Sequence, residues 1–122
     1  MIISPNSYPT RLPVNWYTKE PIGKHPDIPG ITGQSVVIVI EKKFNRFEKI
    51  LVKIFRAPET LERPLDDMNS LFWELMDGSR TFEEICDIMD GIFHERIAPV
   101  SERLSLSLEN FLKLNLVILV EN

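Results

Sequence analysis

The sequence contains few side chains of the kinds that carry out chemistry, and their surroundings decide what they could do. Cys86 could act as a nucleophile, but it lies mid-helix beside Ile85, close to an apolar stripe and among acidic residues. A reactive cysteine needs an exposed, electropositive setting, because the thiolate is the nucleophile. Neighbouring carboxylates instead raise the pKa of a thiol. We therefore expect Cys86 to be a small, buried hydrophobic residue.

The histidines and paired carboxylates also give no catalytic set. His25 and His94 each lack a second ligand at metal-binding spacing. The pairs 66–67 and 83–84 are adjacent carboxylates, and adjacent residues on a helix do not face each other. Helix capping explains both pairs. With no glycine-rich phosphate loop either, the sequence predicts no catalytic residue, no metal site and no cofactor, and hence a protein that is not an enzyme.

Charge is spread unevenly along the chain, whose formal net charge is −4. Residues 35–64 carry seven basic and four acidic side chains, whereas residues 66–98 carry two basic and nine acidic ones. Acidic helices oppose contact with phosphates, so the helices are not expected to bind nucleic acid. A winged-helix transcription regulator that binds DNA through a basic hairpin stays the alternative. The same hairpin could equally be a solvated edge. Its basic residues are Lys42, Lys43, Arg46 and Lys49.

The 122 residues suit one domain preceded by an arm. Residues 1–34 hold six of the nine prolines, which predicts an irregular arm that Trp16 and Tyr17 pin to the surface or that reaches a partner. The domain proper is expected over residues 35–122. A single cysteine allows no internal disulfide, and neither a secretion signal nor a long apolar run is evident. These features favour a cytoplasmic protein without a membrane segment.

Two strands are predicted in the first half of the domain. Residues 35–44 and 48–56 are rich in β-branched side chains, and the polar stretch between them fits a hairpin with its tip at residues 45–46. Residues 60–65 predict a short third strand. Pro64 lacks a backbone donor, which places that strand at a sheet edge.

From Asp66 the apolar spacing changes from two residues to about 3.6, which predicts a helix that ends at Gly78. The sequence "TFEE" at 81–84 is a capping box that starts a second helix after a tight turn. A third helix is expected over residues 100–114 and an extended segment over 116–120. The fold class is therefore α+β, winged helix-turn-helix-like: an N-terminal antiparallel β-hairpin and a short third strand, followed by three helices.

The edge strand suggests a binding mode that needs no catalytic residue. Unused backbone groups of an edge strand can pair with an extended peptide, and the third helix could form the other wall of a groove. Two of its leucines could equally be core residues. An open edge also makes a homodimer plausible. The predicted peptide-binding residues are Thr60, Leu61, Glu62, Arg63 and Leu65 on the strand, and Ser101, Leu104, Ser105, Leu108 and Leu112 on the helix.

Residues 56–89 contain a run of short motifs: Pro58-Glu59, Leu65-Asp66, Trp73-Glu74-Leu75, Asp77-Gly78, Arg80-Thr81 and Glu84-Ile85. Through these motifs the chain resembles, over about residues 35–120, the PqqD family, small proteins of pyrroloquinoline quinone (PQQ) biosynthesis that are related to RiPP recognition elements, which bind ribosomally made, modified peptides. The segment "FLKLNLVILV" (111–120) also fits the end of the family pattern.

The resemblance implies a non-catalytic accessory protein. Family members bind the leader part of a precursor peptide as an added strand between the third strand and the third helix, and present it to a radical S-adenosylmethionine (SAM) enzyme. Carried over by position, the groove would lie between residues 60–65 and residues 101–112. This chain departs from the pattern in two places: Pro64 removes one donor from the edge strand, and the arm of residues 1–34 precedes the usual start.

Overall fold

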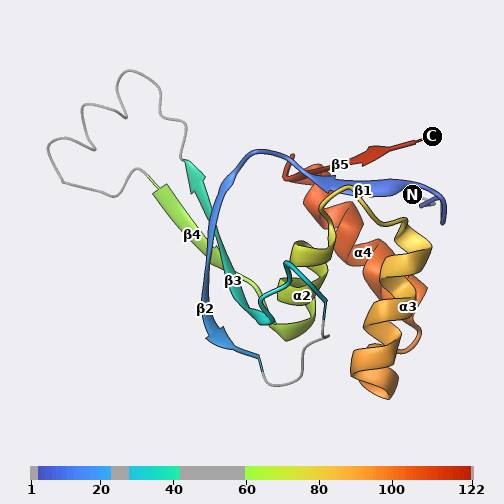
Figure 1. Cartoon of the computed structure of the whole chain (residues 1–122). Coiled ribbons are helices and arrows are strands. Elements are labelled where there is room, and N and C mark those ends of the chain that lie inside the picture. Colours follow the sequence, from blue (N-terminus) through green and yellow to red (C-terminus); the bar gives the residue numbers. More distant parts are fainter. Residues whose placement is uncertain (1–2, 23–27, 42–59, 122) are drawn as a thin grey trace, which may run out of the picture.

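A computed structural model describes residues 3–22, 28–41 and 60–121 of the chain (Figure 1). The predicted strand at 48–56, the hairpin tip and the basic hairpin residues Lys42, Lys43 and Lys49 lie outside these residues. The strands are β1 Tyr8–Arg11, β2 Asn15–Pro21, β3 Gln34–Glu41, β4 Thr60–Pro64 and β5 Val117–Val120. The helices are α2 Asp67–Leu75, α3 Phe82–Phe93, the 3₁₀ helix η1 His94–Ile97, and α4 Val100–Lys113.

The fold is α+β, as predicted, with a three-stranded antiparallel sheet on one side and the helices on the other (Figure 1). The strand order is β2-β3-β4, so β4 lies at an edge of the described sheet, as its proline predicted. Val36 and Ile38 of β3 are fully buried and belong to the hydrophobic core. Their alternation with outward-facing residues fixes which face of the sheet meets α2.

The prediction of an irregular arm over residues 1–34 is wrong for two stretches. β2 pairs with β3 along its length, and β1 pairs with β5 at the other end of the molecule. The prolines are compatible with this because Pro21 closes β2 and Pro9 lies in a two-stranded ribbon, where a missing donor is tolerated. Trp16 does pack against the core, as predicted, whereas Tyr17 lies on the outer face of the sheet.

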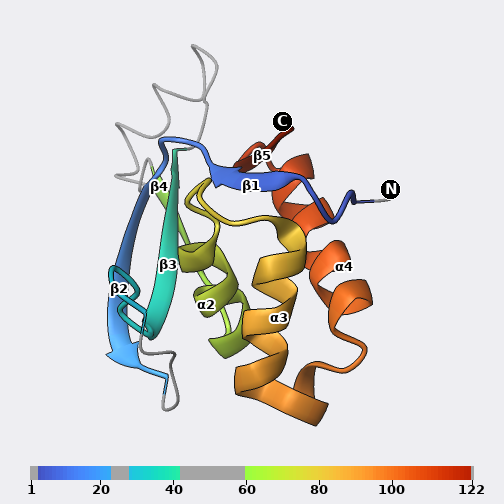
Figure 2. The same ribbon diagram turned by 45° about the vertical axis from the view of Figure 1, so that its right-hand side comes forward.

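The starts of the helices confirm the prediction, but α2 ends at Leu75 and not at Gly78, where the sequence predicts its end. Asp66 caps α2 by accepting from the N–H of Asn69 at 2.8 Å, and α4 covers nearly the predicted range. Figure 2 shows α2, α3 and α4 beside one another, with β1 and β5 crossing above them. Aromatic rings pack between the layers: the centre of the Trp73 ring lies 5.5 Å from that of Phe111 on α4 and 6.2 Å from that of Trp16 on β2.

Candidate functional site

One backbone hydrogen bond shows which residues of β4 direct their backbone groups towards β3 and which direct them outward. The N–H of Leu65 donates to the carbonyl of Val36 on β3 at 2.9 Å. In an antiparallel ladder the N–H and C=O of a residue point to the same side, and the side alternates along the strand. Residues 60, 62 and 64 therefore direct their backbone groups away from β3. At the outer edge Pro64 can offer only its carbonyl. Its missing N–H therefore removes no hydrogen bond from the β3–β4 ladder and lowers only the number of donors available on the outer edge.

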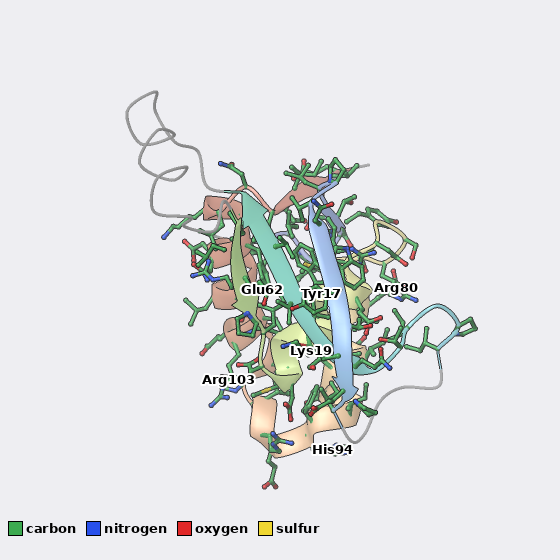
Figure 3. All side chains as sticks on the ribbon, turned by 90° about the vertical axis from the view of Figure 1, so that its left-hand side faces the viewer. Tyr17, Lys19, Glu62, Arg80, His94 and Arg103 are labelled. Atoms are coloured by element: carbon green, nitrogen blue, oxygen red, sulfur yellow. The ribbon has the colours of Figure 1, made fainter. Side chains whose placement is uncertain are left out.

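The side chains of β4 divide between the two faces of the sheet. Leu61 lies opposite Ile40 on the helix side, yet it is 53% exposed because it projects beyond the core. Glu62 lies on the outer face with Tyr17 (Figure 3). A hydrogen bond to Glu62 is the main reason why the pKa of Tyr17 is raised. An exposed leucine at a sheet edge is a contact surface for an apolar side chain.

A groove of about 320 Å³ lies between the start of α2 and one flank of α4, and it begins at Asp66, two residues after the end of β4. Leu104 forms part of its floor, and Arg103 lies on its rim and points away from the sheet (Figure 3). The Arg103 guanidinium donates to the carbonyl of Arg96 at 3.0 Å, and Arg96 pairs with Asp67 at 3.9 Å. The residues lining this groove, called here the edge groove, are Asp66, Met68, Asn69, Ile97, Arg103, Leu104, Leu106 and Ser107.

The structure separates the residues that the sequence grouped into one site. Of the predicted residues on α4, Leu104 lines the edge groove, whereas Leu108 is fully buried in the core. Ser101 and Ser105 line a different groove, between α4 and α3. Leu112 is half-buried and packs against the core. Arg103 and Ser107 line the edge groove with Leu104, whereas the two predicted serines do not.

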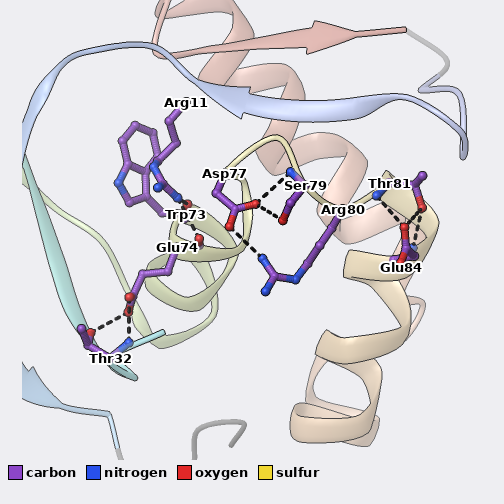
Figure 4. Close-up of polar contacts among 9 residues, drawn as sticks. All are labelled: Arg11, Thr32, Trp73, Glu74, Asp77, Ser79, Arg80, Thr81 and Glu84. Atoms are coloured by element: carbon purple, nitrogen blue, oxygen red, sulfur yellow. Dashed lines mark hydrogen bonds and ion pairs between the residues drawn. The ribbon is translucent and has the colours of Figure 1, made fainter. Parts of the chain in front are cut away.

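Asp77, Gly78 and Arg80, which belong to the short sequence motifs, build the turn between α2 and α3 (Figure 4). Asp77 accepts from the N–H of Ser79 at 2.9 Å, from its hydroxyl, and from the Arg80 guanidinium at 3.1 Å. Partial burial would raise the pKa of Asp77, but these hydrogen bonds and the Arg80 charge outweigh burial and lower it. Gly78 adopts φ +86°, and a Cβ there would lie 3.1 Å from the Thr10 hydroxyl. These residues shape the corner and have no reacting partner.

Two further motif residues have structural roles. The Thr81 hydroxyl accepts from the Glu84 N–H at 3.2 Å, and the Glu84 carboxylate accepts from the Thr81 N–H at 3.0 Å, which confirms the predicted capping box. The backbone and hydroxyl of Thr81 thereby lower the pKa of Glu84. Glu74 is buried, and its carboxylate accepts from the Thr32 N–H at 2.9 Å, the Thr32 hydroxyl at 2.8 Å and the Gly33 N–H at 3.2 Å (Figure 4).

Sequence reasoning missed Arg11, which joins β1 to the end of α2. Its guanidinium donates to the carbonyls of Trp73 and Glu74, both at 2.7 Å, and its central carbon lies 5.2 Å from the centre of the Trp16 ring. These two carbonyls belong to the last turn of α2, which lacks the usual donors four residues further on, although the Trp73 carbonyl also accepts from the N–H of Met76 at 3.2 Å. A cation near a helix C-terminus is a recognisable pattern, but only when it is close in sequence, and Arg11 is 62 residues away from Trp73.

The residues whose side chains could act in catalysis or bind a metal do not form a cluster in the described part of the chain. Cys86 is buried, as predicted, and burial together with Asp87 and Glu83 raises its pKa to about 11. His94 is exposed in η1, and His25 lies outside the described residues. Among residues 3–22, 28–41 and 60–121, no three His, Cys, Asp or Glu side chains are grouped as metal ligands would be. Within the same ranges, no helix has the length and apolar character that spanning a membrane requires.

Comparison of the chain with protein-family models, with curated proteins and with solved structures gives no match.

Proposed function

We propose that this chain is a non-catalytic accessory protein that captures the leader segment of a precursor peptide as an added strand on β4, and presents it to a radical SAM maturation enzyme. The observation that carries the proposal is the outward direction of the backbone at residues 60, 62 and 64, next to an exposed Leu61 and a groove along α4. Strand addition uses such backbone groups for affinity and adjacent pockets for specificity.

The chemistry of the edge groove suits an extended peptide of mixed character. Met68 and Leu104 offer apolar surface, whereas Asn69 and Ser107 offer hydrogen-bonding groups. A peptide strand beside β4 can pair with both backbone groups of Thr60 and Glu62, but only with the carbonyl of Pro64. We therefore expect pairing to be strongest towards the start of β4 and to weaken towards Leu65, where side-chain contacts with α4 take over.

Two substitutions at one position test the backbone pairing. Glu62→Ala removes the side chain and its contact with Tyr17 but retains the N–H, whereas Glu62→Pro removes both. Because this N–H points away from β3, the proline should leave the sheet folded, as Pro64 does. One net hydrogen bond contributes about 0.5–1.5 kcal/mol, so Glu62→Pro should bind a leader peptide about three- to tenfold more weakly than Glu62→Ala.

The probe is a synthetic leader segment of a short candidate precursor peptide, titrated into ¹⁵N-labelled protein. Support requires amide shifts at residues 60–65 and at 103–107, together with weaker binding by Glu62→Pro than by Glu62→Ala. Equal affinities of the two variants, or shifts confined to other elements, would contradict strand addition. Tight, steeply salt-dependent binding of duplex DNA would instead favour the transcription-regulator alternative.

A further inference from the structure

A second groove lies on the opposite flank of α4 from the edge groove. It has a volume of about 720 Å³ and lies between α3 and α4, where the N-terminal segment crosses their ends (Figure 2). Ile3, Phe82 and Cys86 form its apolar floor, and Leu106, which is 69% exposed, lies at its margin. This volume is in the range of sites that bury large ligands, about 300–1,000 Å³. We call it the acidic groove.

Carboxylates line both sides of the acidic groove. Glu83 and Asp87 lie one turn apart on α3, and Glu102 and Glu109 lie two turns apart on α4. At a rise of about 1.5 Å per residue these pairs extend over about 6 Å and about 10 Å along their helices. No lysine or arginine is among the described residues that line the groove. Burial is the main reason why the pKa of Cys86 is raised, and the negative charges of Asp87 and Glu83 add to the shift.

We infer that the acidic groove binds a basic amphipathic helix of a partner protein, whose apolar side chains enter the floor while its lysines and arginines face the carboxylates of the rim. An apolar floor between two helices suits the stripe of an incoming helix. Charge selects the sign of the polar face, since an acidic helix would meet four carboxylates. This surface does not involve β4, and although it shares Leu106 with the edge groove, its carboxylates lie outside that groove, so the inference stands independently of leader-peptide capture.

A pair of charge-matched variants tests the assignment. The rim variant carries Glu83→Gln, Asp87→Asn and Glu102→Gln, and the remote variant carries Asp90→Asn, Glu95→Gln and Glu121→Gln, which are exposed and lie outside the groove. Both variants change the net charge by the same amount. A third variant, Ser105→Phe, places a ring in the groove without changing charge. Thermal melts of each variant show whether it remains folded.

The probe is a fluorescein-labelled 14-residue peptide of lysine and leucine with leucines at helical spacing, measured by fluorescence anisotropy. The control peptide has glutamate in place of every lysine. Exposed ion pairs each contribute about 0.2–1 kcal/mol, so the loss of three pairs should make the rim variant bind the lysine peptide between about threefold and about a hundredfold more weakly than the native chain, and the remote variant within about twofold of it. Ser105→Phe should weaken binding at least as much as the rim variant does.

Three results would overturn the inference. The first is no saturable binding of the lysine peptide by the native chain, and the second is equal weakening by the rim and remote variants, which would indicate non-specific attraction. The third is a dimer in light scattering that the rim substitutions dissociate, because the groove would then be covered by a second copy of this chain. Amide shifts at residues 82–87 and 101–109 on titration, absent with the glutamate peptide, would support it.

Discussion

Replacing Glu74 with glutamine should destabilise the fold by about 2 kcal/mol without removing any apolar contact. One carboxylate oxygen accepts from the Thr32 hydroxyl and the Gly33 N–H, and the other accepts from the Thr32 N–H. A glutamine can keep its oxygen on only one of these sides, and its NH₂ group then faces a donor. A hydrogen bond to a charged group contributes about 1.5–3 kcal/mol, partly offset here because the variant no longer buries a charge.

The assay is thermal unfolding followed by circular dichroism. Unfolding entropy near the midpoint is about 2.1 cal/mol/K per residue, so for 122 residues a loss of about 2 kcal/mol lowers Tm by about 8 °C. Glu95→Gln, an exposed acid on η1, is the control and should leave Tm within about 1–2 °C. If Glu74→Gln lowered Tm by no more than this control, the three hydrogen bonds would not hold residues 32–33 against α2, and the reasoning would be refuted.

Three further predictions concern the turn and the cysteine. Gly78→Ala should cost at least about 1–2 kcal/mol in urea unfolding, because alanine is strained at φ +86° and its Cβ approaches Thr10. The lowered pKa values of Asp77 and Glu84 stabilise the fold above the ordinary carboxyl range, about pH 4, and this contribution is lost as pH falls through the lowered values. Glu84→Gln should therefore lower Tm at pH 7 and leave it nearly unchanged at pH 2. With a pKa of about 11, the Cys86 thiol should react with Ellman's reagent at pH 7 at least about a hundredfold more slowly in the folded chain than in urea.

The helices could be predicted because their start signals are local. Asp66 and the Thr81–Glu84 capping box each satisfy backbone donors within three residues, so the chain chemistry at those positions is nearly independent of the rest of the fold. The 3.6-residue apolar spacing then gives the buried face of each helix. Gly78 was also recognisable, although α2 ends at Leu75 and the glycine shapes the turn after it.

The strands of the first 34 residues could not be predicted from the same kind of signal. β2 has the alternating exposure of an edge strand, but it is extended because it pairs with β3. The prolines near both of its ends are typical of irregular segments, so the sequence pattern favours an arm. β1 depends on β5, more than 100 residues later in the chain. Such pairings are a property of tertiary structure, because strand propensity reflects packing against neighbours.

The rotation of α4 about its own axis, relative to the sheet, also could not be predicted from the sequence. This rotation decides which side chains line the same groove. Residues 103 and 105 are about 200° apart around a helix, so they lie on opposite flanks of the buried stripe formed by Leu104 and Leu108. The sequence shows that stripe but not which flank faces β4. This is why the two predicted serines belong to the acidic groove, while Ser107 belongs to the edge groove.

The same geometry makes the two grooves separately testable with one substitution at two positions. Ser105→Phe and Ser107→Phe add the same ring to half-exposed serines on opposite flanks of α4. Ser105→Phe should weaken binding of the lysine–leucine peptide and leave binding of the leader peptide unchanged, and Ser107→Phe should have the opposite effects. Leu106 lines both grooves, so the double variant shows whether the two losses add to within about 0.3–0.5 kcal/mol or are coupled through that residue. If either substitution weakened both peptides equally, α4 would not divide the surface into two sites, and one of the two assignments would have to be withdrawn.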